Sequence, residues 1–185
     1  QFLLDGTGPW RDLLERVGAW SPDWSPPGCG PVEYVERLGL LSDRLIAVHG
    51  VQFTDNELRR LAQSGATVVA CPRSNRWTGA GVPPIRGFYA CGVRVALGTD
   101  SLASVPDLNL FSELAAMRVL APEAPARQLL AAATQGGADA LGRSDLGRLV
   151  EGARADLTMI DLDRPNLEQV IDPIQTMMTS RHRRE

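Results

Sequence analysis

The residues best suited to chemistry follow three short apolar runs of the chain. His49 comes directly after the first run, the polar segment 71–75 follows the second, and Asp100 follows the third. An imidazole and a carboxylate that meet can exchange protons as an acid and a base, or they can bind one metal ion together. These two residues are therefore the first candidates for a catalytic pair.

Each candidate also has a structural explanation, and the spacing alone leaves both explanations open. A lone histidine after an apolar strand is often a hydrogen-bonded core residue, and an aspartate before a helix often caps that helix. The chain has two histidines, His49 and His182, and only His49 ends an apolar run as Asp100 does. This coincidence favours the catalytic interpretation.

The three apolar runs, residues 45–48, 67–70 and 94–97, are typical of buried parallel strands. Their ends are separated by close to the roughly 30 residues that one βα unit of an eight-stranded barrel needs. In such barrels the reacting groups lie at the carboxyl ends of the strands. We therefore expect three adjacent parallel strands in sequence order, with His49 and Asp100 at one rim.

Amphipathic stretches around these strands predict helices that cover the sheet. One helix begins at Thr54, where Glu57 completes a capping box, and ends at Gly65. The proline-rich stretch 21–31 is expected to be a loop. The remaining predicted helices cover residues 10–17, 32–38, 108–119 and 125–141.

The alternation of strands and helices predicts the α/β class, with part of a (β/α)8 barrel that runs into a small β domain. We assign residues 1–146 to the barrel and 147–185 to the start of the second domain and a tail, because the run 156–161 suggests a strand in another layer. Three strands cannot close a barrel, and they leave an apolar edge and interior in water. The chain is therefore expected to be truncated at both ends.

The composition limits the class of protein and its partners. Of the 185 residues, 44% are apolar and 22% are charged, and no apolar run is long enough to span a membrane. The net charge is -3, which indicates no surface for nucleic acid. Three widely spaced cysteines, Cys29, Cys71 and Cys91, favour buried thiols in a reducing compartment, and we expect the cytoplasm.

The segments around the candidate strands form an ordered succession, LIAVHG, TVVACPRSN and VRVALGTDS, followed by DLGRLVEGARADLTMIDLD. The first three resemble the sixth, seventh and eighth barrel strands of the amidohydrolase superfamily, in its deaminase and chlorohydrolase branch. The fourth is similar to the passage where that family leaves the barrel for a small β-sandwich. The resemblance extends from about Gly6 to Asp163.

The resemblance implies a role for each residue that matches a family motif. His49 matches a catalytic histidine that orients the group under attack. Asp100 matches a catalytic aspartate that binds the metal and passes a proton from water to the leaving amine. A substrate-binding loop is matched by Arg73, Ser74, Asn75 and Trp77. The implied cofactor is one divalent metal, namely zinc with iron or manganese as alternatives.

The implied activity is hydrolysis of a C–N bond in a small molecule, with deamination of a purine-like or heterocyclic amine as the main hypothesis. The alternatives are a chlorohydrolase, a cyclic amidase, or a catalytically silent fragment. The last alternative arises because the family's His-x-His pair and its further histidine have no match here, and one carboxylate cannot hold zinc alone. The resemblance also implies a homodimer.

Overall fold

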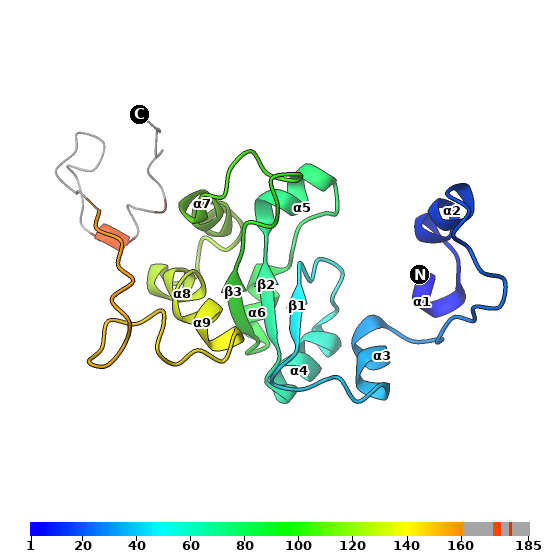
Figure 1. Ribbon diagram of the computed structural model, residues 1–185, viewed down its shortest axis with the longest axis horizontal. Helices are drawn as coiled ribbons and strands as arrows, with labels where there is room; N and C mark the ends of the chain where they lie inside the picture. Colours follow the sequence, from blue (N-terminus) through cyan, green and yellow to red (C-terminus); the bar gives the residue numbers. More distant parts are fainter. Residues whose placement is uncertain (161–171, 175–177, 179–185) are drawn as a thin grey trace. The chain divides into compact units, whose positions relative to one another are not determined.

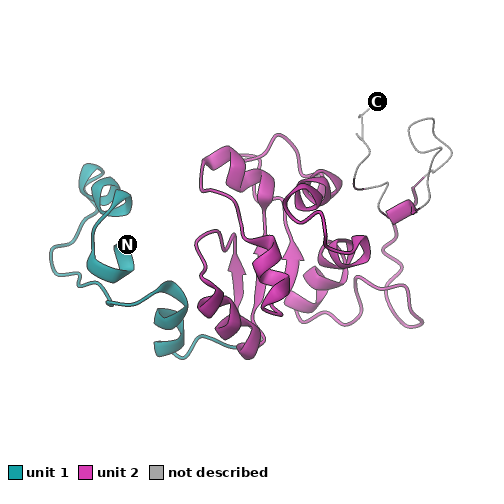
Figure 2. Cartoon of the chain, turned by 180° about the vertical axis from the view of Figure 1, so that it is seen from behind, with its two compact units in different colours: residues 1–42 teal, residues 43–185 magenta. Residues whose placement is uncertain are grey.

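The computed structural model describes residues 1–160, 172–174 and 178, and the chain divides into two compact units (Figure 1, Figure 2). Unit 1 is Gln1–Ser42 and unit 2 is Asp43–Glu185. Within the described residues, no helix is long and apolar enough to cross a membrane.

Unit 1 contains the helices α1 (Phe2–Asp5), α2 (Pro9–Arg16) and α3 (Pro31–Arg37). A proline opens both α2 and α3, at the helix position where no backbone N–H is needed. Phe2 stacks on Trp24 with ring centroids 4.5 Å apart, and Trp20 meets both rings edge-on. This aromatic cluster ties α1 to the loop that follows α2.

Unit 2 is built on a parallel sheet of three strands in the order β1, β2, β3. The strands are β1 (Ile46–Val48), β2 (Thr67–Ala70) and β3 (Arg94–Leu97). The register places Val48 beside Val69 and Ala70 beside Leu97, so the three strands end at the same edge of the sheet. The prediction of adjacent parallel strands in sequence order is confirmed, and the closed barrel stays a prediction.

Helices connect the strands and cover the sheet (Figure 1). They are α4 (Asp55–Ser64), α5 (Pro72–Thr78), α6 (Ile85–Ala90), α7 (Leu110–Leu120), α8 (Ala126–Ala132) and α9 (Gln135–Ala140). The capping box of α4 forms as predicted, because the Thr54 hydroxyl accepts from Glu57 N–H and the Glu57 carboxylate accepts from Thr54 N–H. Gly65 ends the helix in the left-handed conformation that suits glycine.

The core lies where β2 and β3 meet the helices, and β1 is its open side. Val68 of β2, Leu61 of α4 and Phe88 of α6 are fully buried. On β1, by contrast, Ile46 is 38% exposed and Val48 is 50% exposed. The apolar strand edge expected of an unclosed sheet is therefore present in unit 2.

One loop prediction and one helix prediction need correction. Residues 73–77 lie on α5 rather than in a loop, because Pro72 opens a helix there and Gly79 ends it. The single helix expected at 125–141 is two helices, α8 and α9. The chain breaks at Thr134, whose backbone leaves the helical region and whose hydroxyl donates to the Leu130 carbonyl oxygen at 2.9 Å.

The second domain has no structural test in the described part of the chain. Residues 147–160 contain no strand, because a strand needs a hydrogen-bonded neighbour and the described residues provide none there. Asp161 and the basic end at 181–185 lie outside the described residues. The domain boundary at 146 and 147 stays a prediction.

All three cysteines are free, but they differ in burial. Cys29 and Cys71 are buried, whereas Cys91 is only partly buried at the end of α6. The expectation of three buried thiols is therefore wrong for Cys91. Burial raises the pKa of Cys71 to about 11, so this thiol is protonated at neutral pH and little reactive thiolate is present.

Candidate active site

His49 and Asp100 meet at the carboxyl edge of the sheet. His49 follows β1, where its N–H donates to the Val69 carbonyl oxygen at 2.9 Å and extends the ladder by one residue. Asp100 lies beyond the end of β3, and its Oδ2 is 3.9 Å from His49 Nε2. The two side chains are 40% and 35% exposed, so both reach the solvent side of this edge.

The backbone at both residues is strained. His49 has φ 72° and Asp100 has φ 64°, and they are the only non-glycine residues with positive φ in the described ranges. A side chain in this left-handed region costs on the order of 1–3 kcal/mol, and such residues gather at functional sites. The fold therefore concentrates its backbone strain at the two candidate catalytic residues.

The structural explanations for both residues disagree with the structure. His49 is not a hydrogen-bonded core residue, because its Nδ1 is buried and finds no partner among the described residues. Asp100 does not cap a helix, because the following helix α7 is capped by Asn109, whose side chain accepts from Phe111 N–H. The catalytic role of both residues stays a prediction.

Two serine hydroxyls hold the Asp100 carboxylate. Ser74 Oγ donates to Oδ2 at 2.6 Å and Ser104 Oγ donates to the same oxygen at 3.0 Å. The Ser74 hydrogen bond, followed by that from Ser104, lowers the pKa of Asp100, so the group stays ionised at neutral pH. Both hydroxyls bond the same oxygen, and the Ser101 backbone N–H gives the carboxylate a further hydrogen bond.

The four residues predicted to bind substrate occupy different environments on α5. Ser74 is buried and bonds Asp100, so its hydroxyl serves the carboxylate. Arg73 pairs with Asp107, with Nη1 2.9 Å from Oδ1. Asn75 is buried with both amide atoms unpartnered within the described residues. Trp77 is 72% exposed.

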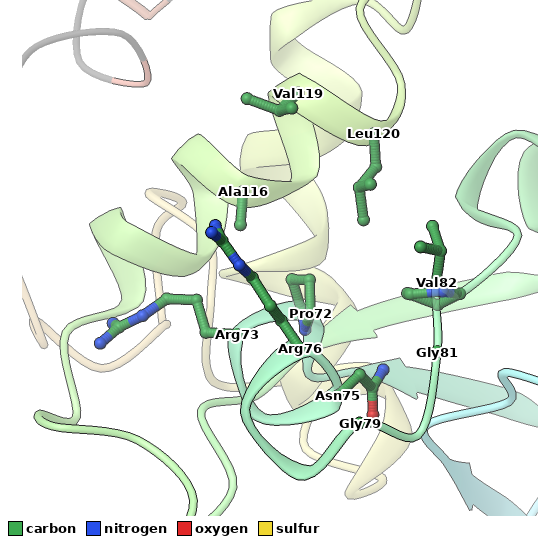
Figure 3. A pocket seen from close by; sticks show the side chains of 11 residues that line it. Pro72, Arg73, Asn75, Arg76, Gly79, Gly81, Val82, Ala116, Val119 and Leu120 are labelled. Carbon is green, nitrogen blue, oxygen red and sulfur yellow. The ribbon is translucent and has the colours of Figure 1, made fainter.

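A pocket of about 340 Å³ lies between α5, the segment 79–83 and α7 (Figure 3). Its walls are Pro72, Arg73, Asn75, Arg76, Gly79, Gly81, Val82, Pro83, Ala116, Val119 and Leu120. His49 and Asp100 are not among them. Residues 72, 75, 76 and 79 share one face of a helix by their spacing, and Ser74 lies on the other face. The pocket and Asp100 are therefore on opposite sides of α5.

Two residues of this region were missed by the sequence analysis, Ser104 and Glu113. Ser104 follows Asp100 by four positions, in a turn where serines carry no distinctive signal. Glu113 is fully buried on α7, and its Oε2 accepts from Arg73 N–H at 3.1 Å. A single acidic residue between apolar ones, as in LFSELAAM, was the available signal for a buried carboxylate.

The residues present fit one position of a metal site. Carboxylate oxygens are suitable ligands for zinc, and Asp100 offers an ionised carboxylate whose two serine hydroxyl bonds both go to Oδ2. Zinc sites need three or four protein ligands. Nowhere in the described ranges do three or more His, Cys, Asp or Glu side chains gather in that way.

Comparison with known proteins gives consistent matches in sequence. The sequence model of the amidohydrolase family matches residues 27–183. A 5-methylthioadenosine/S-adenosylhomocysteine deaminase of Halobacterium salinarum is 44% identical over 154 residues, which cover 80% of this chain and 36% of that protein. The deaminase of the same name from Pyrococcus furiosus is 40% identical over 160 residues, 83% of this chain and 38% of that protein.

Solved structures of deaminases and chlorohydrolases are also similar to this chain. An adenosine deaminase from Xanthomonas campestris with bound zinc superposes with a TM-score of 0.77 at 37% identity, over 82% of this chain and 36% of that one. Atrazine chlorohydrolase from Arthrobacter aurescens, complexed with zinc, superposes with a TM-score of 0.75 at 34% identity, over 82% and 36%. The chain thus spans a little over a third of the length of these relatives.

Proposed function

The chain belongs to the amidohydrolase family, and from this premise we propose that it supplies part of the active site of a metal-dependent enzyme that deaminates a purine-like or other heterocyclic amine. The observation that carries the proposal is the meeting of His49 and Asp100, 3.9 Å apart and both in left-handed backbone. The relatives named as deaminases of adenosine derivatives support the choice of reaction.

Asp100 holds the metal and moves the proton. Its ionised carboxylate is anchored at Oδ2 by Ser74 and Ser104, which bond neither lone pair of Oδ1, and Oδ1 is the oxygen that we propose meets a cation or a proton. When bound, a divalent metal supplies a hydroxide at neutral pH by lowering the pKa of water to about 7. The carboxylate accepts a proton from the attacking water and returns it to the leaving amine.

His49 orients and polarises the group under attack. Its Nε2 faces the solvent side of the strand edge next to Asp100 Oδ2, within reach of a substrate seated there. An N–H at this position donates a hydrogen bond to the substrate, whereas the other ring nitrogen is buried. The histidine thus acts on the substrate while the aspartate handles the proton.

The remaining parts of the proposal concern the longer protein. We infer a (β/α)8 barrel in which β1, β2 and β3 are the sixth to eighth strands, completed by residues outside this sequence. The zinc-bound solved relatives favour zinc as the metal. A small β domain from residue 147 and a homodimer are part of the same proposal.

A chlorohydrolase is the second candidate, favoured by the superposition on atrazine chlorohydrolase at 34% identity. The same attack by hydroxide expels chloride or an amine, so the residues at this edge serve either reaction. The leaving group separates the two candidates directly. Ammonia release from adenine nucleosides supports the first, and chloride release from a chlorinated triazine supports the second.

The test uses the full-length gene product, with its coding sequence read upstream of Gln1 for a His-x-His motif. Asp100→Asn is expected to lower kcat/KM by more than about 10³-fold and to lower the zinc content, because it removes the charge but keeps the size. Asp156→Asn, on an exposed segment, is the matched control and should leave both unchanged. Normal turnover by Asp100→Asn, or no His-x-His motif upstream, would overturn the assignment.

A further inference from the structure

We propose that Glu113 is a positioning residue for Asp100, acting at a distance through the first turn of α5 and the Ser74 hydroxyl. The proposal rests on the proposed function, because it concerns the carboxylate that holds the metal. Glu113 lies on α7 and contacts no reacting group itself. Its influence passes through three contacts, described in turn.

The first contact fixes the start of α5. Pro72 occupies the first position of the helix and has no N–H, and the N-cap residue Cys71 makes no side-chain capping bond. Arg73 therefore carries the first free N–H of the helix. This N–H donates to Glu113 Oε2 at 3.1 Å, so the missing cap is supplied by a residue 40 positions further along the chain.

The second contact holds the side chain of the same arginine. Arg73 Nε is 3.6 Å from Glu113 Oε1, and Arg73 Nη1 is 2.9 Å from Asp107 Oδ1. Asp107 Oδ1 also accepts from the N–H of Asn109, the N-cap of α7. The two acids thus hold the backbone and the guanidinium of one residue, and they lock the start of α5 to the start of α7.

The third contact links the position of α5 to Asp100. Ser74 is the next residue of α5, and its Oγ donates to Asp100 Oδ2 at 2.6 Å and lies 2.9 Å from Ser104 Oγ. Hydrogen bonds between oxygens span only about 2.5–3.0 Å. A shift of α5 by half an ångström would therefore release Asp100 from one of its two hydroxyls.

A purely structural role does not explain a carboxylate at position 113. The side chain is fully buried, its Oε1 has no hydrogen-bond partner among the described residues, and burial raises its pKa. An apolar residue of similar size fills such a site at no electrostatic cost. The acceptor oxygen is retained, in this proposal, because an apolar side chain cannot hold the Arg73 N–H.

The experiment measures zinc affinity of the full-length protein by competition with a chromophoric chelator, together with kcat and KM. Glu113→Leu removes the acceptor and is expected to weaken zinc binding by about 10–100-fold, with a matching fall in kcat and little change in KM. Glu113→Gln keeps an acceptor oxygen for Arg73 N–H and should stay within a few-fold of the wild type. Activity and zinc binding retained in Glu113→Gln would show that the acceptor oxygen, and not the negative charge, is what Asp100 depends on.

Ser74→Ala should reproduce the loss seen in Glu113→Leu, and the double variant should be no worse than either single one, because all act on one contact. Leu129→Ala is the control for general destabilisation, since Leu129 is a fully buried apolar residue of α8 that takes no part in these hydrogen bonds. It should lower the melting temperature without weakening zinc binding.

Zinc binding and kcat of the wild-type level in folded Glu113→Leu would overturn the proposal. If Glu113→Leu does not fold, Ser74→Ala decides, and unchanged zinc affinity in that variant also overturns it. Failure of the proposed function has a different signature. In that case the wild type binds no zinc that Asp100→Asn can release.

Discussion

At the level of single residues, the left-handed backbone of His49 and Asp100 lowers the stability of the fold but places the two side chains next to each other. Each residue carries a Cβ where glycine is the unstrained choice. Both side chains then emerge at the strand ends and meet 3.9 Å apart. Strain of this kind persists only where the surrounding fold imposes it, and here His49 is held by its hydrogen bond to β2 and Asp100 follows the buried strand β3.

Replacing His49 by glycine should make the full-length protein more stable and less active. Glycine relieves the strain at φ 72° but loses more chain entropy on folding, so a net gain of about 1 kcal/mol in the free energy of unfolding is expected. Loss of the imidazole should lower kcat by about 10²–10⁴-fold. Urea unfolding and steady-state kinetics measure the two effects.

His49→Ala is the matched variant, because it also removes the ring but keeps the strained backbone. It should lose activity to the same degree and gain no stability. A glycine variant less stable than the alanine variant would show that the backbone at this position is unstrained.

The buried carboxylate of Glu113 should make stability depend on pH. Burial raises its folded-state pKa above the unfolded value, so its proton is favoured in the fold, and the stability that the protonated form gives is complete below the unfolded pKa. That contribution is lost as the pH rises through the folded pKa. Glu113→Gln mimics the protonated form and should lose less stability than the wild type between pH 4.5 and pH 7.5.

Urea midpoints of the two full-length proteins at both pH values check this. Equal pH dependence in the wild type and in Glu113→Gln would mean that the Arg73 contacts compensate the cost of burial completely.

Residue types and spacing were sufficient to find His49 and Asp100, because both follow apolar runs that are visible in the sequence. Ser104 and Glu113 could not be found in this way. Their partners are brought to them by the packing of α5 against α7, and the Arg73 contact joins residues 40 positions apart. No local pattern encodes such a pairing.

At the scale of elements, α9 packs against β3 so closely that one position admits only glycine. A Cβ added to Gly136 would lie 2.4 Å from the Val95 carbonyl oxygen, which is backbone and cannot turn away. Gly136→Ala is therefore expected to destabilise the full-length protein by about 1–3 kcal/mol. Chemical denaturation measures the change.

Gly137→Ala is the control on the same helix. Nothing lies within 4 Å of its added Cβ, so alanine should be neutral or stabilising by up to about 1 kcal/mol. Similar losses for both variants would place the effect in helix propensity or backbone conformation and not in the contact with β3.

The elements with strong local signals were predictable, and those that depend on packing were not. The three strands and the capping box of α4 follow from apolar runs and cap residues that act locally. Helix α5 was missed because PRSNRWT has no apolar periodicity, and its cap comes from α7. The break before α9 was missed because the alanine-rich sequence favours one continuous helix.

At the scale of the whole molecule, residues 1–185 expressed alone should associate and should retain no stoichiometric zinc. Ile46 and Val48 present apolar side chains on an open strand, and such edges recruit other chains. Asp100 is the single proposed ligand, too few for a zinc site. Light scattering gives the size and elemental analysis gives the metal. A monodisperse monomer with one zinc per chain would contradict both expectations.

Because Cys71 is buried next to the candidate site, the rate at which its thiol is labelled reports how often the structure opens there. This thiol sits where β2 passes into α5, and burial together with the nearby Asp100 and Glu113 carboxylates raises its pKa to about 11. A thiol reagent can modify it only in moments when that junction opens, whereas the partly buried Cys91 is labelled from the start. The labelling rate of Cys71, followed by peptide mass spectrometry, therefore gives the frequency of local opening next to Asp100, and zinc should slow it.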